Sequence, residues 1–374
     1  LDNLYYTLKY ILIIKVFFVE GVKKMKLKEL KIGNILSKLP IIQGGMGVGI
    51  SLSNLAGNVA KNGAIGIISA AHPGYREKDF ETNTLEANIR ALKKHILKAK
   101  EISNNGIIGV NLMVAMNNYQ ELVEATIEGG ADLIISGAGL PLKLPEYTKD
   151  SSIKILPIVS STKATKLILT YWKKHYNKIA DGIIIEGPKA GGHLGFKGDK
   201  IESEIEKFDD NVIDILKTVK EFEEENNQDI PVIVGGGVFD NNDIKKYMNL
   251  GASGVQIGTR FVATNECDAD IRYKNAYVNC TKKDIQIVKS PVGMPGRAIK
   301  NKFLEKIASE GEKITKCYNC LVPCNPSTTP YCISKALINA AYGDIDNGLI
   351  FCGSNAYRID KIVPVSQLID ELIS

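Results

Sequence analysis

The chain has 374 residues, of which 44% are hydrophobic and 24% are charged, an ordinary composition for a globular protein. Its net charge of +5 is mild and its lysines are dispersed, which argues against a nucleic-acid partner. The length suits one large α/β barrel with appendages, or two medium domains.

The amino-terminal residues are not expected to belong to the fold. The apolar run Tyr10–Val19 is interrupted by Lys15 and is too short to cross a bilayer, and it lacks the small-residue cleavage site of a signal peptide. Codons for Glu20-Gly21-Val22 can contain a purine-rich ribosome-binding sequence ahead of Met25. We therefore expect the native protein to start at Met25, with residues 1–24 a non-native or disordered leader, and to have no membrane partner.

Short apolar runs alternate with amphipathic stretches through the middle of the chain. Near-continuous apolar strands are typical of a parallel sheet that is buried on both faces. Eight such units match the TIM (β/α)8 barrel in number and size, and glycines follow many of the strands, which disfavours a doubly wound sheet with one glycine fingerprint. The expected strands are Pro40–Gln43, Ala64–Ser69, Ile107–Met113, Leu133–Ser136, Ile155–Val159, Gly182–Glu186, Pro231–Val234 and Gly254–Ile257. The expected helices include Leu85–Ser103, Tyr119–Glu128, Thr162–His175, Asp210–Glu225 and Asp243–Leu250.

Glycine-rich turns after the last three strands predict the position of a site. Active sites of such barrels lie at the carboxyl ends of the strands, and phosphate groups commonly bind after strands seven and eight. Gly235-Gly236-Gly237 and Gln256-Ile257-Gly258-Thr259 occupy those two places. After strand six, Gly191-Gly192 allows a close approach to a ligand, and His193 follows with the side chain best suited to proton transfer near neutral pH.

The ordered set of these motifs resembles the nitronate monooxygenase family, formerly called 2-nitropropane dioxygenases, which includes enoyl-acyl carrier protein reductase II. The resemblance covers residues 39–302. It rests on the motifs Pro40–Met46, Gly109-Val110-Asn111, Ser136–Gly139, Ala190–His193, Gly236-Gly237, Gln256–Phe261 and Arg297–Asn301. It implies an FMN-dependent barrel oxidoreductase in which His193 is the active-site histidine. By position it also implies that Gly45, Met46, Asn111, Glu186, Gly191 and Gly192 lie along the flavin, and that Gly236, Gly237, Gln256, Ile257, Gly258 and Thr259 hold its phosphate.

The resemblance leaves the reaction open between two chemistries. The first is oxidation of alkyl nitronates, and the second is NAD(P)H-dependent reduction of an enoyl thioester or a quinone. Glu186 and Arg297–Asn301 are more similar to the reductases, whereas the insertion-like segment from His72 to Tyr75 and the stretch Gly293–Gly296 are not. Other hypotheses are a flavin-free barrel that binds a phosphorylated metabolite and a non-catalytic flavin- or partner-binding protein. His72, in a loop after strand two, is expected to be a solvated surface residue.

Four cysteines gather beyond the region that the family resemblance covers. Cys317, Cys320, Cys324 and Cys332 form a tight trio plus one outlier, a spacing that suits an iron–sulfur cluster better than structural zinc. The alternative is that four reduced thiols pack around the start of a helix near Ile333–Ala341.

The domain organisation follows from these assignments. We expect an FMN-binding barrel over residues 25–302 and a helical, cysteine-containing extension over residues 303–374 that packs on it. Seven cysteines without an export signal indicate a reducing, cytoplasmic location. The expected partners are a small-molecule substrate and, in a homodimer, a second copy of the chain.

Overall fold

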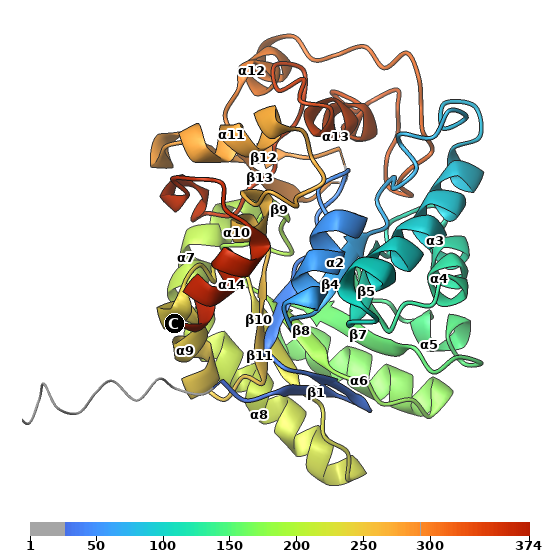
Figure 1. Cartoon of the computed structure of the whole chain (residues 1–374), viewed down its shortest axis with the longest axis vertical. Helices are drawn as coiled ribbons and strands as arrows, with labels where there is room; N and C mark the ends of the chain where they lie inside the picture. The colour runs from blue at the N-terminus through green and yellow to red at the C-terminus, as the bar shows by residue number, and fades with distance from the viewer. Residues whose placement is uncertain (1–26, 292) are drawn as a thin grey trace, which may run out of the picture.

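A computed structural model describes residues 27–291 and 293–374, so the predicted leader lies outside the described residues. Eight strands form one sheet in the order β3-β11-β10-β8-β7-β6-β5-β4, and every neighbouring pair is parallel. The amide of Ile65 donates to the Ile41 carbonyl at 3.0 Å, and the Gln43 amide donates to the Ile65 carbonyl at 2.9 Å. These bonds join β3 to the start of β4, so the sheet closes into the predicted TIM barrel (Figure 1).

The barrel strands lie within two residues of their predicted bounds. They are β3 (Ile41–Gln43), β4 (Gly66–Ser69), β5 (Ile108–Met113), β6 (Leu133–Gly137), β7 (Lys154–Val159), β8 (Ile183–Glu186), β10 (Val232–Gly235) and β11 (Gly254–Ile257). The helices are α2 (Ser53–Lys61), α3 (Thr84–Ser103), α4 (Tyr119–Glu128), α5 (Leu144–Tyr147), α6 (Thr162–Tyr176), α7 (Ile201–Glu206), α8 (Phe208–Asn226), α9 (Asn241–Asn249), α10 (Thr259–Val262), α11 (Ile271–Asn279), α12 (Lys302–Ser309), α13 (Ile333–Ala341) and α14 (Val365–Ile373). Short 3-10 turns lie at Gly198–Lys200, Lys282–Asp284 and Ala356–Arg358.

Burial on both faces explains why the strands are apolar throughout. One set of side chains fills the inside of the barrel, and the other packs against the helices. Each fully buried isoleucine contributes about 1.5–3 kcal/mol through the hydrophobic effect. The inner cluster is Leu30, Ile32, Ile42, Ile65, Ile67, Leu133, Ile135, Leu156, Ile184 and Ile233. Its first two members come from the hairpin of β1 (Leu30–Ile32) and β2 (Ile35–Ser37), which covers the amino ends of the strands at the bottom of Figure 1.

The carboxyl-terminal residues contribute one helix to the ring around the barrel and also form a layer over the carboxyl ends of its strands. Helix α14 packs against α2, α9 and α10, so it takes the place of the helix that follows the eighth strand (Figure 1). The intervening chain contributes β12 (Ile285–Lys289), β13 (Pro295–Ile299) and α11–α13, which lie over the carboxyl ends of the strands. Among the described residues, no helix is long and apolar enough to cross a membrane.

A small antiparallel sheet places His193 at the carboxyl ends of the barrel strands. Strand β9 (Gly192–His193) pairs with β13, where His193 lies opposite Gly296 and Gly192 lies opposite Arg297. The turn after β8 is therefore held from above by a strand that is about a hundred residues further along the chain.

Candidate active site

A cavity of about 460 Å³ opens at the carboxyl ends of the strands, and residues that follow all eight strands line it. The structure brings almost all of the predicted cofactor and catalytic residues to its wall. They are Gly45, Met46, Asn111, Glu186, Gly191, Gly192, His193, Gly236, Gly237, Gln256, Gly258 and Thr259. Ile257 is the one predicted cofactor residue outside the lining; it is 1% exposed and its side chain packs in the core, so its part in binding a phosphate stays a prediction. Only its backbone acts near the site, where its carbonyl accepts the Gly44 amide at 2.8 Å.

The loop after β10 has the geometry of an anion cradle. Gly236 and Gly237 have φ angles of +88° and +105°, a region that side chains rarely adopt. A Cβ on Gly237 would lie 2.9 Å from the Cβ of Lys189. The amides of Gly237 and Val238 donate to no acceptor among the described residues, so they are free for a ligand.

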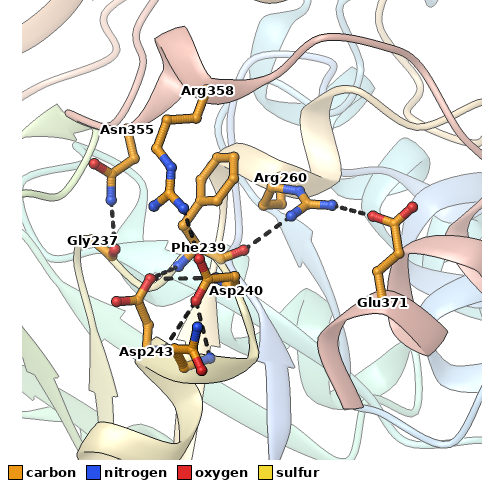
Figure 2. Close-up of polar contacts among 9 residues, drawn as sticks. Gly237, Phe239, Asp240, Asp243, Arg260, Asn355, Arg358 and Glu371 are labelled. Atoms are coloured by element: carbon orange, nitrogen blue, oxygen red, sulfur yellow. Dashed lines mark hydrogen bonds and ion pairs between the residues drawn. The ribbon is translucent and has the colours of Figure 1, made fainter. Parts of the chain in front are cut away.

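The next residues of this loop are clamped by two arginines (Figure 2). The guanidinium carbon of Arg358 lies 4.1 Å from the centre of the Phe239 ring, and that of Arg260 lies 4.7 Å from it. Arg358 also pairs with Asp240 at 2.7 Å, and Asp240 caps helix α9. Asn355 donates to the Gly237 carbonyl at 2.8 Å. These contacts fix the conformation of the glycine loop through protein groups alone.

Two buried polar atoms near the cradle have no protein partner. Gln256 lines the cavity, and its side-chain oxygen has no hydrogen bond. The same is true of the Ser354 hydroxyl, whose neighbour Gly353 donates its amide to the Thr259 hydroxyl at 3.0 Å. Buried polar groups normally have hydrogen-bond partners, so these two unpartnered atoms indicate that a polar ligand binds here.

The His193 ring has a fixed orientation and is uncharged at physiological pH. Its Nε2 lies 2.6 Å from the Ser290 hydroxyl, and its ring meets that of Phe351 edge-on at 5.1 Å. Burial lowers the pKa of His193 to about 4, so the imidazole is neutral at physiological pH. A neutral imidazole offers one donor and one acceptor to its surroundings.

Glu186 ends β8 on the same cavity wall. Burial raises its pKa to about 7, opposed by a hydrogen bond from the Gly195 amide that favours the charged form. Near neutral pH this carboxyl is therefore divided between its protonated and ionised states, which is a frequent property of functional carboxyls.

Arg297 fixes the backbone between these two residues. The guanidinium is 4% exposed and donates to the Ala190 carbonyl. Burial lowers the pKa of Arg297 from its ordinary value. The adjacent Gly191 lies against Cys352, because a Cβ on Gly191 would be 2.6 Å from the Cys352 carbonyl carbon. This close approach requires glycine at position 191.

The prediction that His72 is a solvated loop residue is wrong. His72 is 7% exposed, and its Nε2 lies 2.7 Å from the Ser334 hydroxyl. Asn88 and the rings of Phe80 and Tyr318 surround it, and burial lowers its pKa to about 4. His72 does not line the cavity; it joins the loop after β4 to helix α13.

The four clustered cysteines lie outside the cavity lining. Cys317 is exposed, whereas Cys320, Cys324 and Cys332 are partly buried, and none forms a disulfide. Within residues 27–291 and 293–374, no three His, Cys, Asp or Glu side chains are arranged to hold a metal ion.

Several lining residues were not predicted. Phe351, Cys352, Gly353 and Asn355 enter the cavity wall from the carboxyl-terminal extension, and Lys189 enters from the turn after β8. The Lys189 side chain lies against Gly237 and makes no ion pair with the carboxylates of the described residues, so its charge is available beside the cradle. The Gly-Ser-Asn turn that ends the apolar run Leu349–Cys352 was the available sequence signal.

Comparisons with known proteins agree with this arrangement. A family model described as nitronate monooxygenase matches residues 28–374. A probable nitronate monooxygenase from Staphylococcus saprophyticus is 27% identical over 78% of this chain and 83% of its own length.

Solved structures give the same picture. FabK from Thermotoga maritima is 26% identical with a TM-score of 0.68, over 89% of this chain and 91% of that one. A nitroalkane oxidase from Streptomyces ansochromogenes, 18% identical, has the same fold with a TM-score of 0.68 over 90% of this chain and 95% of its own.

Proposed function

Because this chain belongs to the nitronate monooxygenase family, we propose that it is an FMN-dependent oxidoreductase that oxidises alkyl nitronates, with His193 as the catalytic residue. The observation that carries the proposal is that one cavity joins an open glycine cradle to a neutral histidine and a carboxyl of raised pKa. The first of these features suits a phosphate, and the other two suit proton handling.

The cradle residues fit the phosphate end of FMN. The free amides of Gly237 and Val238 and the Lys189 ammonium offer donors and a positive charge to a phosphate. The unpartnered Gln256 oxygen can accept a hydrogen bond from a ligand hydroxyl, not from the phosphate. The absence of a side chain at Gly45 lets Asn111 pack close to it in the cavity wall, since a Cβ on Gly45 would lie 2.3 Å from the Asn111 Cβ. Bound FMN would carry electrons from the substrate to molecular oxygen.

The protein's own groups handle the charge and protons of the substrate. A nitronate is an anion whose oxygens accept hydrogen bonds, and the neutral His193 can donate to one of them or take up a proton. Ser290 holds the ring by its Nε2, which fixes the ring's orientation. The protonated form of Glu186 leaves the cavity free of a competing negative charge.

Oxygen consumption tests this proposal. The purified full-length chain, supplied with FMN, should consume oxygen on addition of an alkyl nitronate and not on addition of the parent nitroalkane held in its neutral form. Absence of nitronate-dependent oxygen uptake by a flavin-loaded protein would contradict the proposed reaction.

A second function, NAD(P)H-dependent reduction of an enoyl thioester or a quinone, is favoured by one observation. Glu186 has the residue type that resembles the reductases, and its raised pKa suits a group that delivers a proton to a reduced product. Anaerobic bleaching of the flavin by NAD(P)H, followed by reoxidation with an enoyl thioester or a quinone, would assign this reaction instead. A colourless protein that takes up no FMN would favour the flavin-free phosphometabolite barrel.

A further inference from the structure

Methionine side chains make up an unusual share of the cavity wall. Four of the six methionines of the chain line the cavity, namely Met46, Met113, Met116 and Met294. Methionine is flexible and polarisable, so it adapts to apolar groups of different shapes and is frequent where varied apolar partners bind. The polar groups of the cavity suit a phosphate and proton handling, and these side chains take part in neither.

The strand order places two of these methionines across the barrel from the cradle. Around the closed ring of eight strands, β5 is four places from β10, and β6 is four places from β11. Four places in a ring of eight is the diametrically opposite position. Met113 ends β5, Met116 follows it, and Leu140 follows β6. These three residues therefore line the cavity on the side opposite the glycine cradle.

Helix α13 extends this side of the cavity. Leu337, in the middle of the helix, is a lining residue. Ser334 at the start of α13 contacts His72 in the loop after β4, and the Tyr342 hydroxyl donates to the Tyr75 carbonyl in the same loop at 3.1 Å. Strand β4 adjoins β5, so the helix lies on the side of the cavity where β5 ends. We call the four lining residues of this side the far wall: Met113, Met116, Leu140 and Leu337.

The charged groups of the cavity lie away from the far wall. Among the described residues that line the cavity, only Glu186 and Lys189 are acidic or basic apart from the neutral His193. Glu186 ends β8, which adjoins β10, and the Lys189 side chain lies against Gly237 of the cradle. A carboxylate that was buried against the far wall would have no cation to pair with, and an unpaired buried charge is costly. The far wall therefore favours neutral, apolar groups.

We propose that the far wall binds an apolar chain of the substrate, and that it selects long alkyl chains over chains that end in a carboxylate. The reacting end of such a substrate lies beside His193, where Met294 adds an apolar side chain. The Met294 carbonyl accepts the Ser290 amide at 3.3 Å, and the Ser290 hydroxyl contacts His193. The identity of the reacting group rests on the proposed function, whereas the binding of the chain does not.

The dependence of kcat/KM on chain length tests this inference in the unaltered enzyme. Each methylene that moves from water onto the far wall should raise kcat/KM about fourfold, so ethyl, butyl and hexyl nitronates should differ by about an order of magnitude at each step. A hexyl nitronate whose far end is a carboxylate should be used about a hundredfold less well than hexyl nitronate. Equal kcat/KM values across the alkyl series, or equal use of the carboxylated chain, would overturn the inference.

A cation placed in the far wall should change this preference. In Met113→Lys, kcat/KM should fall for hexyl nitronate and rise for the carboxylated chain, so that their ratio drops about tenfold or more. Met248→Lys, which alters a methionine on α9 outside the cavity lining, is the matched control and should keep the native ratio. A native ratio in a Met113→Lys variant that retains FMN would contradict the assigned position of the chain.

Calorimetric titration with neutral carboxamides separates this inference from the proposed reaction. Butanamide, hexanamide and octanamide bind without turnover, and each step in length should strengthen binding to the full-length protein, supplied with FMN, by about tenfold. Binding that tightens with length in a protein that oxidises no nitronate would support the chain site and refute the reaction. Nitronate oxidation together with amide binding that does not depend on length would refute the chain site and leave the reaction standing.

Discussion

At the scale of single residues, burial shifts the pKa values of His193 and Glu186, both in the cavity wall, in opposite directions. It lowers the pKa of His193 to about 4 and raises that of Glu186 to about 7. In both cases the uncharged form is favoured, because a low-dielectric cavity wall penalises charge. The group that changes charge near neutral pH is therefore Glu186, not the histidine.

Replacement of His193 tests its catalytic role. His193→Ala should keep FMN bound, because the glycines of the cradle follow a different strand, β10, and should lower turnover by on the order of a hundredfold or more. Flavin absorbance and the rate of nitronate-dependent oxygen uptake measure the two effects. His175→Ala, which alters an exposed histidine on α6, is the matched control. Equal turnover in both variants would remove His193 from the mechanism.

The titration of Glu186 predicts a pH dependence of substrate binding. Below pH 7 the carboxyl is protonated, and above it the carboxylate repels an anionic nitronate. The KM for the nitronate should therefore rise as the pH increases through about 7. Glu186→Gln, which cannot ionise, should give a flat profile at the low-pH value of the native enzyme. A profile that keeps its inflection in the variant would show that another group titrates.

At the scale of elements, the barrel strands could be predicted because their own residues identify them. The strands that were not predicted depend on pairing with distant parts of the chain. Each barrel strand is a short β-branched run that is buried on both faces, so its own residues identify it. Strand β9 has two residues and exists only because β13 pairs with it, and β12 and β13 lack a continuous apolar pattern. No local pattern identifies such strands.

The same distinction applies to the site. Motifs after the strands predicted the glycine cradle and His193, since the topology of a barrel brings strand ends together. The contributions of Phe351 and Asn355, and the burial of His72 against Ser334, depend on contacts with distant parts of the chain. The position of His72 in a loop predicted a surface residue, but contacts with distant parts of the chain bury its side chain.

The loop after β10 provides a test of the cradle. Gly237→Ala should lower the FMN affinity strongly, because the new Cβ would enter the space between the loop and Lys189. Gly251→Ala is a matched control, since Gly251 has a similar φ of +107° and its nearest foreign atom would be 3.7 Å from the new Cβ. Titration with FMN separates the two variants. If both variants bind FMN as tightly as the native chain, the phosphate does not lie against Gly237.

At the scale of the whole molecule, one family model matches residues 28–374, and both the β1–β2 hairpin and helix α14 pack on the barrel. Helix α14 closes the helical ring, and the residues between α13 and α14 return to the cavity wall. The barrel and its extension thus build the site jointly. The homodimer and the cytoplasmic location stay predictions.

Anaerobic spectroscopy of the full-length protein tests the central claim most directly, namely that the cavity binds FMN and presents it to a nitronate. The account predicts a yellow protein with about one FMN per chain, bound in the cradle after β10. Its flavin spectrum should bleach on addition of an alkyl nitronate and return when air is admitted. A protein that binds no FMN, or a bound flavin whose spectrum no nitronate alters, would contradict it.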